Sequence, residues 1–116
     1  MRTGLALLAK FILTLVAAFI AFNYLMNNEI TWTLLVALVG TGVNYLIGDL
    51  MVLPSMGNLV ASIGDGIMAA LTAYVIDILI AGFATTWNAL VWFGILITVG
   101  EFFFHRYLQT DEKVAP

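Results

Sequence analysis

Four long apolar stretches separated by short polar breaks constrain the fold of this chain more than any other feature. The stretches cover about residues 5–26, 31–52, 59–82 and 87–105. A membrane-spanning helix needs about 20 mainly apolar residues, because it rises about 1.5 Å per residue through a hydrocarbon layer about 30 Å thick. We therefore predict an all-α integral membrane domain of four helices over residues 1–108, followed by a polar cytoplasmic tail over 109–116.

The composition indicates that lipid is the solvent of this chain. Hydrophobic residues make up 63% of the sequence and charged residues 9%, whereas soluble domains are roughly 45–50% apolar and about 25% charged. A water-soluble fold would expose apolar patches large enough to cause aggregation. The sequence also carries no basic patch interleaved with aromatic residues, so we expect no nucleic-acid partner. The bilayer is the expected partner.

The breaks between the apolar stretches are short. Asn27, Asn28 and Glu29 end the first stretch, and Gly82 to Thr86 separate the last two. The middle break contains Pro54, Gly57 and Asn58, residue types that favour a hairpin turn. Short connections join antiparallel neighbours, so an up-down-up-down bundle is expected.

The basic residues predict the orientation in the membrane. Arg2, Lys10, Arg106 and Lys113 all lie near the two ends of the chain, and the breaks carry no lysine or arginine. Positively charged flanks stay on the cytoplasmic side. Because an even number of spans puts both ends on one side, we predict that both termini are cytoplasmic.

Several ionisable and amide side chains lie inside or at the edge of the apolar stretches. Charged groups in a bilayer are costly and usually face protein or water. From a rise of about 1.5 Å per residue, seven of these groups are expected to converge in the cytoplasmic half, namely Lys10, Asn44, Asp49, Asp65, Glu101, His105 and Arg106. Asp77 is expected alone in the outer half.

Three interpretations of this polar cluster remain open. It could be a packing network in which Lys10 or Arg106 pairs with a carboxylate. It could be a proton or cation site, since carboxylates that share an apolar site do not all ionise easily. It could also bind a small ligand. Asp49 and Asp65 lie eight residues either side of Gly57, so contact across the hairpin is plausible.

Small residues predict close helix packing. Gly40, Asn44 and Gly48 recur every four residues and form one stripe, and Gly94 shares a face with Glu101. Small-xxx-small stripes promote helix association in lipid. We expect packing within the bundle in preference to dimerisation.

Catalytic and cofactor motifs are not recognisable in the sequence. His105 is the one histidine and has no zinc-binding motif around it, and neither Ser55 nor Ser62 lies in a nucleophile motif. We therefore expect no enzyme activity, no cofactor and no metal.

Two segments carry a resemblance to a known family. The segment from Gly48-Asp49 through Leu53-Pro54 to Asp65, and the segment from Gly100-Glu101 through His105-Arg106 to Leu108, are similar to the YndM-like bacterial membrane proteins. Lys10-Phe11 fits as well, and the match runs along the whole chain. The resemblance implies a small four-span protein of the bacterial plasma membrane, of unknown function.

These observations favour a non-catalytic accessory or interaction protein, with a second membrane protein or a further copy of the chain as possible partner. The alternative is an oligomeric ion or proton channel, or a proton-coupled carrier of small solutes, that uses the embedded carboxylates. A single bundle of four helices is too narrow to enclose a pore, so transport would need at least a dimer.

Overall fold

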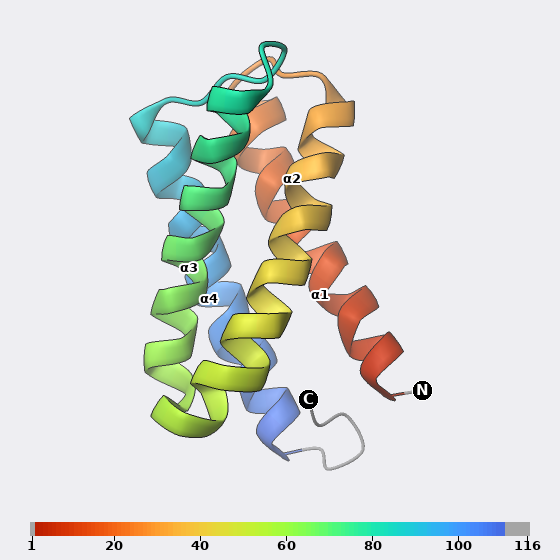
Figure 1. Ribbon diagram of the computed structural model, residues 1–116, viewed down its shortest axis with the longest axis vertical. Helices are drawn as coiled ribbons and strands as arrows, with labels where there is room; N and C mark the ends of the chain where they lie inside the picture. Colours follow the sequence, from red (N-terminus) through yellow and green to blue (C-terminus); the bar gives the residue numbers. More distant parts are fainter. Residues whose placement is uncertain (1, 111–116) are drawn as a thin grey trace.

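A computed structural model describes residues 2–110, which form four antiparallel helical arms (Figure 1). The first arm is α1 (Arg2–Phe19) continued by the π-helix η1 (Ile20–Tyr24), and the second is α2 (Ile30–Val43) continued by the π-helix η2 (Asn44–Val52). The remaining arms are α3 (Leu53–Leu79) and α4 (Trp87–Thr110). The chain runs up, down, up and down, as the short breaks predict.

Three continuous helical stretches are long and apolar enough to cross a membrane: Gly4–Tyr24, Ile30–Leu79 and Trp87–Phe104. The middle stretch folds back on itself at Gly57, where the backbone takes a φ of 85°. It therefore supplies two arms of the bundle, α2–η2 and α3 (Figure 1). The all-α, four-helix membrane fold predicted from the sequence is confirmed.

The hairpin is tighter than the sequence indicates. Residues 53–58 were expected to form a turn, but α3 begins at Leu53, directly after η2. Val52 and Leu53 both keep helical backbone angles, so the helical backbone continues from η2 into the segment that contains Pro54. Only Gly57 leaves helical geometry, and glycine reaches positive φ without the clash that a side chain would cause. Asn58 then donates a hydrogen bond from Nδ2 to the Phe102 carbonyl of α4, at 2.9 Å.

Other helix boundaries also differ from the predicted ones. The first arm ends at Tyr24 and α3 ends at Leu79, each earlier than expected, whereas α4 continues to Thr110. Apolar character alone does not end a helix, and residues 106–110 contain no glycine or proline that would end α4. The expected polar tail over 109–116 thus begins inside α4, and residues 111–116 lie outside the described part.

The two π-helices were not predicted. Their hydrogen bonds join residues five apart, which widens the turn and rotates the following side chains. Periodicity analysis assumes an α-helix throughout, so it does not detect such segments. η2 is the more consequential of the two, because it contains Asp49.

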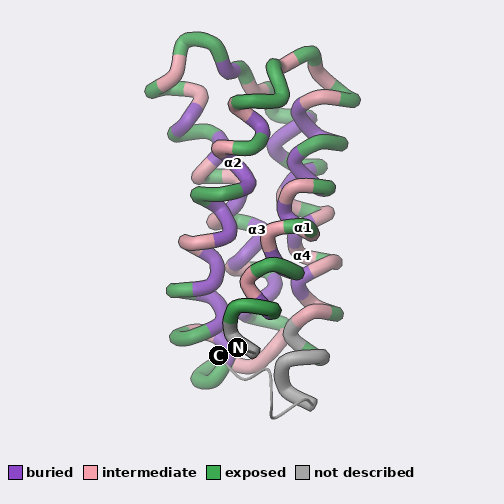
Figure 2. The backbone as a smooth tube through the Cα atoms, turned by 90° about the vertical axis from the view of Figure 1, so that its right-hand side faces the viewer, coloured by how far each residue is buried: buried purple, intermediate pink, exposed green. Residues whose placement is uncertain are grey.

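Buried residues line the inside of the bundle and exposed ones its outside (Figure 2). The surface is rich in large apolar side chains. At one end the core contains Phe22, which packs edge-to-face on Phe83 and Phe93 with ring centroids 5.2 and 5.0 Å apart. Small residues such as Ala18 and Ala73 fill the space between helices. Outward-facing apolar side chains are more than a third exposed, and Ile67 is 58% exposed, as expected where lipid covers the surface.

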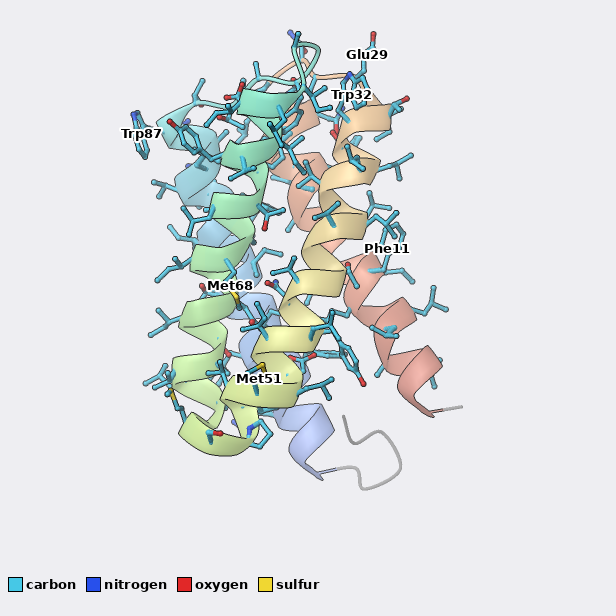
Figure 3. The ribbon with its side chains drawn as sticks, in the orientation of Figure 1. Phe11, Glu29, Trp32, Met51, Met68 and Trp87 are labelled. Carbon is cyan, nitrogen blue, oxygen red and sulfur yellow. The ribbon has the colours of Figure 1, made fainter. Side chains whose placement is uncertain are left out.

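We call the two ends of the bundle the hairpin end, which contains Pro54 and Gly57, and the loop end, which contains residues 25–29 and 80–86. α1 begins and α4 ends at the hairpin end (Figure 1). Glu29, Trp32 and Trp87 lie at the loop end, and Met51 lies toward the hairpin end (Figure 3).

A single asparagine joins the two connections at the loop end. The side-chain amide of Asn28 pairs with both backbone groups of Ala84: Nδ2 donates to the Ala84 carbonyl at 2.9 Å and Oδ1 accepts from its N–H at 2.9 Å. The same Nδ2 donates to the Phe22 carbonyl at 3.1 Å. Asn28 thus ties the 25–29 connection to the 80–86 connection.

Candidate functional site

Each of the four arms contributes one charged side chain to a single buried group, which we call the charge cluster: Lys10 of α1, Asp49 of η2, Asp65 of α3 and Glu101 of α4. All four side chains are 0% exposed. The cluster lies in the half of the bundle nearer the hairpin end.

The Lys10 ammonium is the centre of the charge cluster. Its Nζ lies 3.3 Å from Asp49 Oδ2 and 3.8 Å from Asp65 Oδ2, and it donates a hydrogen bond to Glu101 Oε2. The ring of Phe104 lies below the ammonium, 5.2 Å from Nζ to the ring centroid, close enough for a cation–π interaction. One cation therefore contacts a carboxylate from each of the other three arms.

Local structure explains how these side chains reach one another. Lys10 lies on the inner face of α1, and Thr14 one turn later donates its hydroxyl to the Lys10 carbonyl at 2.8 Å. Gly48 and Asp49 are consecutive residues of η2, and both are buried. Gly48 faces the Asp65 carboxylate directly, because a Cβ built there would overlap it. The glycine therefore allows α3 to bring Asp65 against η2.

Carboxylate oxygens of Asp49, Asp65 and Glu101 lie within 4.8 Å of one another. Such spacing also occurs in metal sites, where carboxylates surround a cation. Here the Lys10 ammonium contacts all three carboxylates, so a cation belonging to the chain already takes the central position.

Three further residues were predicted for the cluster: Asn44, His105 and Arg106. Asn44 is fully buried one turn before Gly48, and within the described part neither of its amide atoms has a hydrogen-bond partner. Arg106 is exposed. The side chain of His105 lies outside the described residues.

Asp77 has a structural partner that the sequence did not reveal. Its Oδ2 accepts a hydrogen bond from the Thr85 backbone N–H at 3.0 Å and another from the Thr85 hydroxyl at 2.6 Å. The carboxylate therefore fixes the connection between α3 and α4. The spacing from Asp77 to Thr85 crosses a loop, and helical periodicity gives no signal for such a contact.

The glycines predicted to pack helices all face neighbouring arms. A Cβ on Gly40 would lie 3.6 Å from Thr14 Cγ2 of α1, and a Cβ on Gly94 would lie 3.3 Å from the Gly66 carbonyl oxygen of α3. These close approaches are within the bundle.

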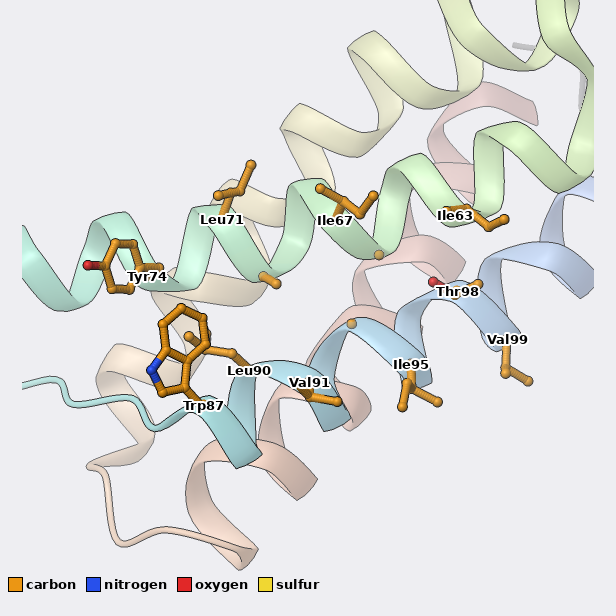
Figure 4. Close-up of a pocket in the computed structure, with 13 residues that line it drawn as sticks. Ile63, Ile67, Leu71, Tyr74, Trp87, Leu90, Val91, Ile95, Thr98 and Val99 are labelled. Carbon is orange, nitrogen blue, oxygen red and sulfur yellow. The ribbon is translucent and has the colours of Figure 1, made fainter.

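Two apolar grooves run along the outer face where α3 and α4 meet. The larger, about 520 Å³, extends from Tyr74 and Trp87 past Gly66 and Gly94 to Thr98 (Figure 4). The smaller, about 240 Å³, continues from Thr98 to Phe102. Neither groove is lined by a residue of the charge cluster.

Comparison with known proteins relates the chain to a bacterial membrane protein. It is 30% identical over 114 residues to the uncharacterized membrane protein YndM of Bacillus subtilis strain 168, a match that covers 93% of this chain. The chain spans 61% of that relative's length. No solved structure matches the chain. A family model described as a protein of unknown function, DUF2512, matches residues 1–114. The chain therefore belongs to this YndM-like DUF2512 family of membrane proteins.

Proposed function

We propose that this chain is a non-catalytic accessory or interaction protein of the bacterial plasma membrane, in which the charge cluster holds the four helices together. One observation supports this role above all: the four charged side chains are 0% exposed. Neither apolar groove on the α3–α4 face reaches them. A substrate would meet no charged side chain in either groove, whereas a buried network ties all four arms to one ammonium.

Flux measurements test this proposal. The full chain is reconstituted into liposomes that contain a pH-sensitive dye, and a proton or sodium gradient is applied. We expect the same flux as in liposomes without protein. Flux that depends on the protein, and that Glu101→Gln abolishes while the helical circular-dichroism spectrum is kept, would contradict the proposal.

The accessory role also requires a partner. Isolation of the tagged full chain from native membranes in mild detergent should recover a second copy or another membrane protein at a constant ratio. A chain that is always recovered as a single copy with lipid alone would contradict an interaction role.

A second candidate function is proton-coupled transport by an oligomer. Three carboxylates that gather around one ammonium inside the bundle favour it, because embedded carboxylates of this kind serve as proton relays in transporters. The flux experiment decides between the two functions.

We further propose that both termini are cytoplasmic, on the basis of the terminal basic residues. The hairpin end would then face the cytoplasm and the loop end the outside. A reporter fused after Pro116 should be active only as a cytoplasmic fusion, and activity of a periplasmic reporter at that position would contradict this orientation.

A further inference from the structure

The larger groove on the α3–α4 face is a cavity that the proposed function does not use. Its volume of about 520 Å³ lies within the range of small-molecule sites, about 300–1,000 Å³. No charged side chain lines it, and most of its lining residues are aliphatic. A ligand that fits this groove is therefore mainly a hydrocarbon.

Small residues lie at the bottom of the groove and large ones along its edges. Gly66 and Gly94 bring the backbones of α3 and α4 together, since a Cβ on Gly94 would lie 3.3 Å from the Gly66 carbonyl oxygen. The edge residues are aliphatic, recur every four positions along each helix and are each 46% exposed or more: Ile63, Ile67 and Leu71 on α3, and Val91, Ile95 and Val99 on α4 (Figure 4). Residues four apart share a helix face, so the groove runs parallel to the two helices.

The length of the groove matches one leaflet of a bilayer. Its α3 side runs from Ile63 to Tyr74, which is about 16 Å at a rise of about 1.5 Å per residue. One leaflet of a hydrocarbon layer about 30 Å thick measures about 15 Å. The smaller groove extends the α3 side to Leu59, and the total of about 22 Å is still short of the about 30 Å that a spanning helix needs. The length favours an acyl chain over a helix from a second copy.

Two aromatic side chains lie at the end of the groove nearer the loop end. Tyr74 and Trp87 stack with ring centroids 6.5 Å apart and ring planes at 18° (Figure 4). Trp87 is 80% exposed and is the first residue of the last membrane-spanning stretch. Tyrosine and tryptophan rings settle at the level of lipid headgroups, and their O–H and N–H groups donate hydrogen bonds. The pair therefore lies where the headgroup of a lipid in the groove would be.

We propose that the groove between α3 and α4 binds one acyl chain of a phospholipid from the leaflet at the loop end, with the headgroup beside Tyr74 and Trp87. The occupant is a lipid because the groove opens on the outer face of a membrane bundle, where hydrocarbon is the surrounding solvent. Lipid binding here does not depend on the accessory role or on which side of the membrane the termini lie.

Photo-cross-linking in vesicles tests this proposal. The full chain is reconstituted into vesicles of phosphatidylethanolamine and phosphatidylglycerol that contain a phospholipid with a diazirine on one acyl chain. We expect adducts on groove residues several times more often than on the exposed α1 residues Leu8, Ile12 and Val16, which line neither groove. Equal labelling of both faces would show ordinary contact with surrounding lipid, and a groove labelled less than α1 would show that protein covers it. Either result would overturn the proposal.

Ala70→Leu fills the groove and supplies a matched test. Ala70 lines the groove and is partly exposed, and leucine is a good helix former. Groove adducts should fall severalfold, whereas Ala9→Leu at an exposed position of α1 should leave them unchanged.

Trp87→Ala is a second variant, at an exposed position outside the core. It leaves the floor of the groove open but removes an aromatic ring from its end, so groove adducts should also fall. Circular dichroism identifies which variants are folded. Unchanged groove adducts in every folded variant of Ala70 and Trp87, or an equal loss in Ala9→Leu, would contradict the proposal.

Discussion

Gly48 of η2 lies directly against the carboxyl group of Asp65 in α3, with no room for a Cβ between the helix backbone and the acid. This approach joins the two arms of the hairpin at the depth of the charge cluster. Gly48, which has neither a charge nor a side chain, is therefore one of the residues that determine the geometry of the charge cluster.

Gly48→Ala should therefore destabilise the bundle. The methyl group must displace a fully buried carboxyl or push α3 away, and over-packing of this kind typically costs about 1–3 kcal/mol. The thermal midpoint in detergent measures the effect. Gly42→Ala in α2 is the control, because nothing lies within 4 Å of a Cβ at that position. An equal loss in both variants would show that contact with Asp65 is not the cause.

Lys10→Met should be the most damaging single substitution in the charge cluster. It keeps an unbranched apolar stem but removes an ammonium that contacts Asp49, Asp65 and Glu101. Removing one partner of a buried ion pair typically costs about 3–5 kcal/mol. The free energy of unfolding in detergent measures the loss.

The matched rescue combines Lys10→Met with Glu101→Gln and Asp49→Asn. These changes remove two of the three carboxylates that contact the lost ammonium, so the triple variant should be more stable than Lys10→Met alone. A triple variant that is no better than the single one would argue that Lys10 acts through packing alone.

Asn28→Ala should loosen the loop end. It removes the paired hydrogen bonds to Ala84 and the bond to the Phe22 carbonyl. The expected cost is about 1.5–4.5 kcal/mol, since each of these bonds contributes about 0.5–1.5 kcal/mol. Hydrogen exchange of the Ala84 amide should become faster. Asn27→Ala is the control at an exposed neighbouring position, and faster exchange there too would count against a specific role of Asn28.

Asp77→Ala should increase the mobility of the connection between α3 and α4. Thr85 loses the acceptor for its backbone N–H and for its hydroxyl, and the expected cost is about 1–2 kcal/mol. Asp77→Asn keeps one side-chain oxygen as an acceptor and should cost less. Limited proteolysis near Thr85 checks both variants, and unchanged cleavage in Asp77→Ala would contradict an anchoring role.

Some features could be predicted from the sequence because they depend on composition and local geometry. The four apolar runs determine a membrane bundle, since each run is long enough to cross the hydrocarbon layer. Gly57 determines where the hairpin turns, because glycine reaches a φ of 85° without strain. The depth of Asp49 and Asp65 along their helices follows from helical rise.

Other features were decided only by the tertiary structure. Which carboxylates meet Lys10, and how closely, depends on the rotation of each arm about its own axis, and the π-turns of η2 change that rotation for Asp49. Asn28 and Asp77 find their partners across loops, where no periodicity relates residue spacing to position in space. The sequence by itself thus determined that lipid surrounds the protein, that the bundle has four arms and that a hairpin joins two of them. Each of these features depends on residues within one continuous segment. The charge cluster formed only when four separate segments packed, because its contacts join residues up to 91 positions apart.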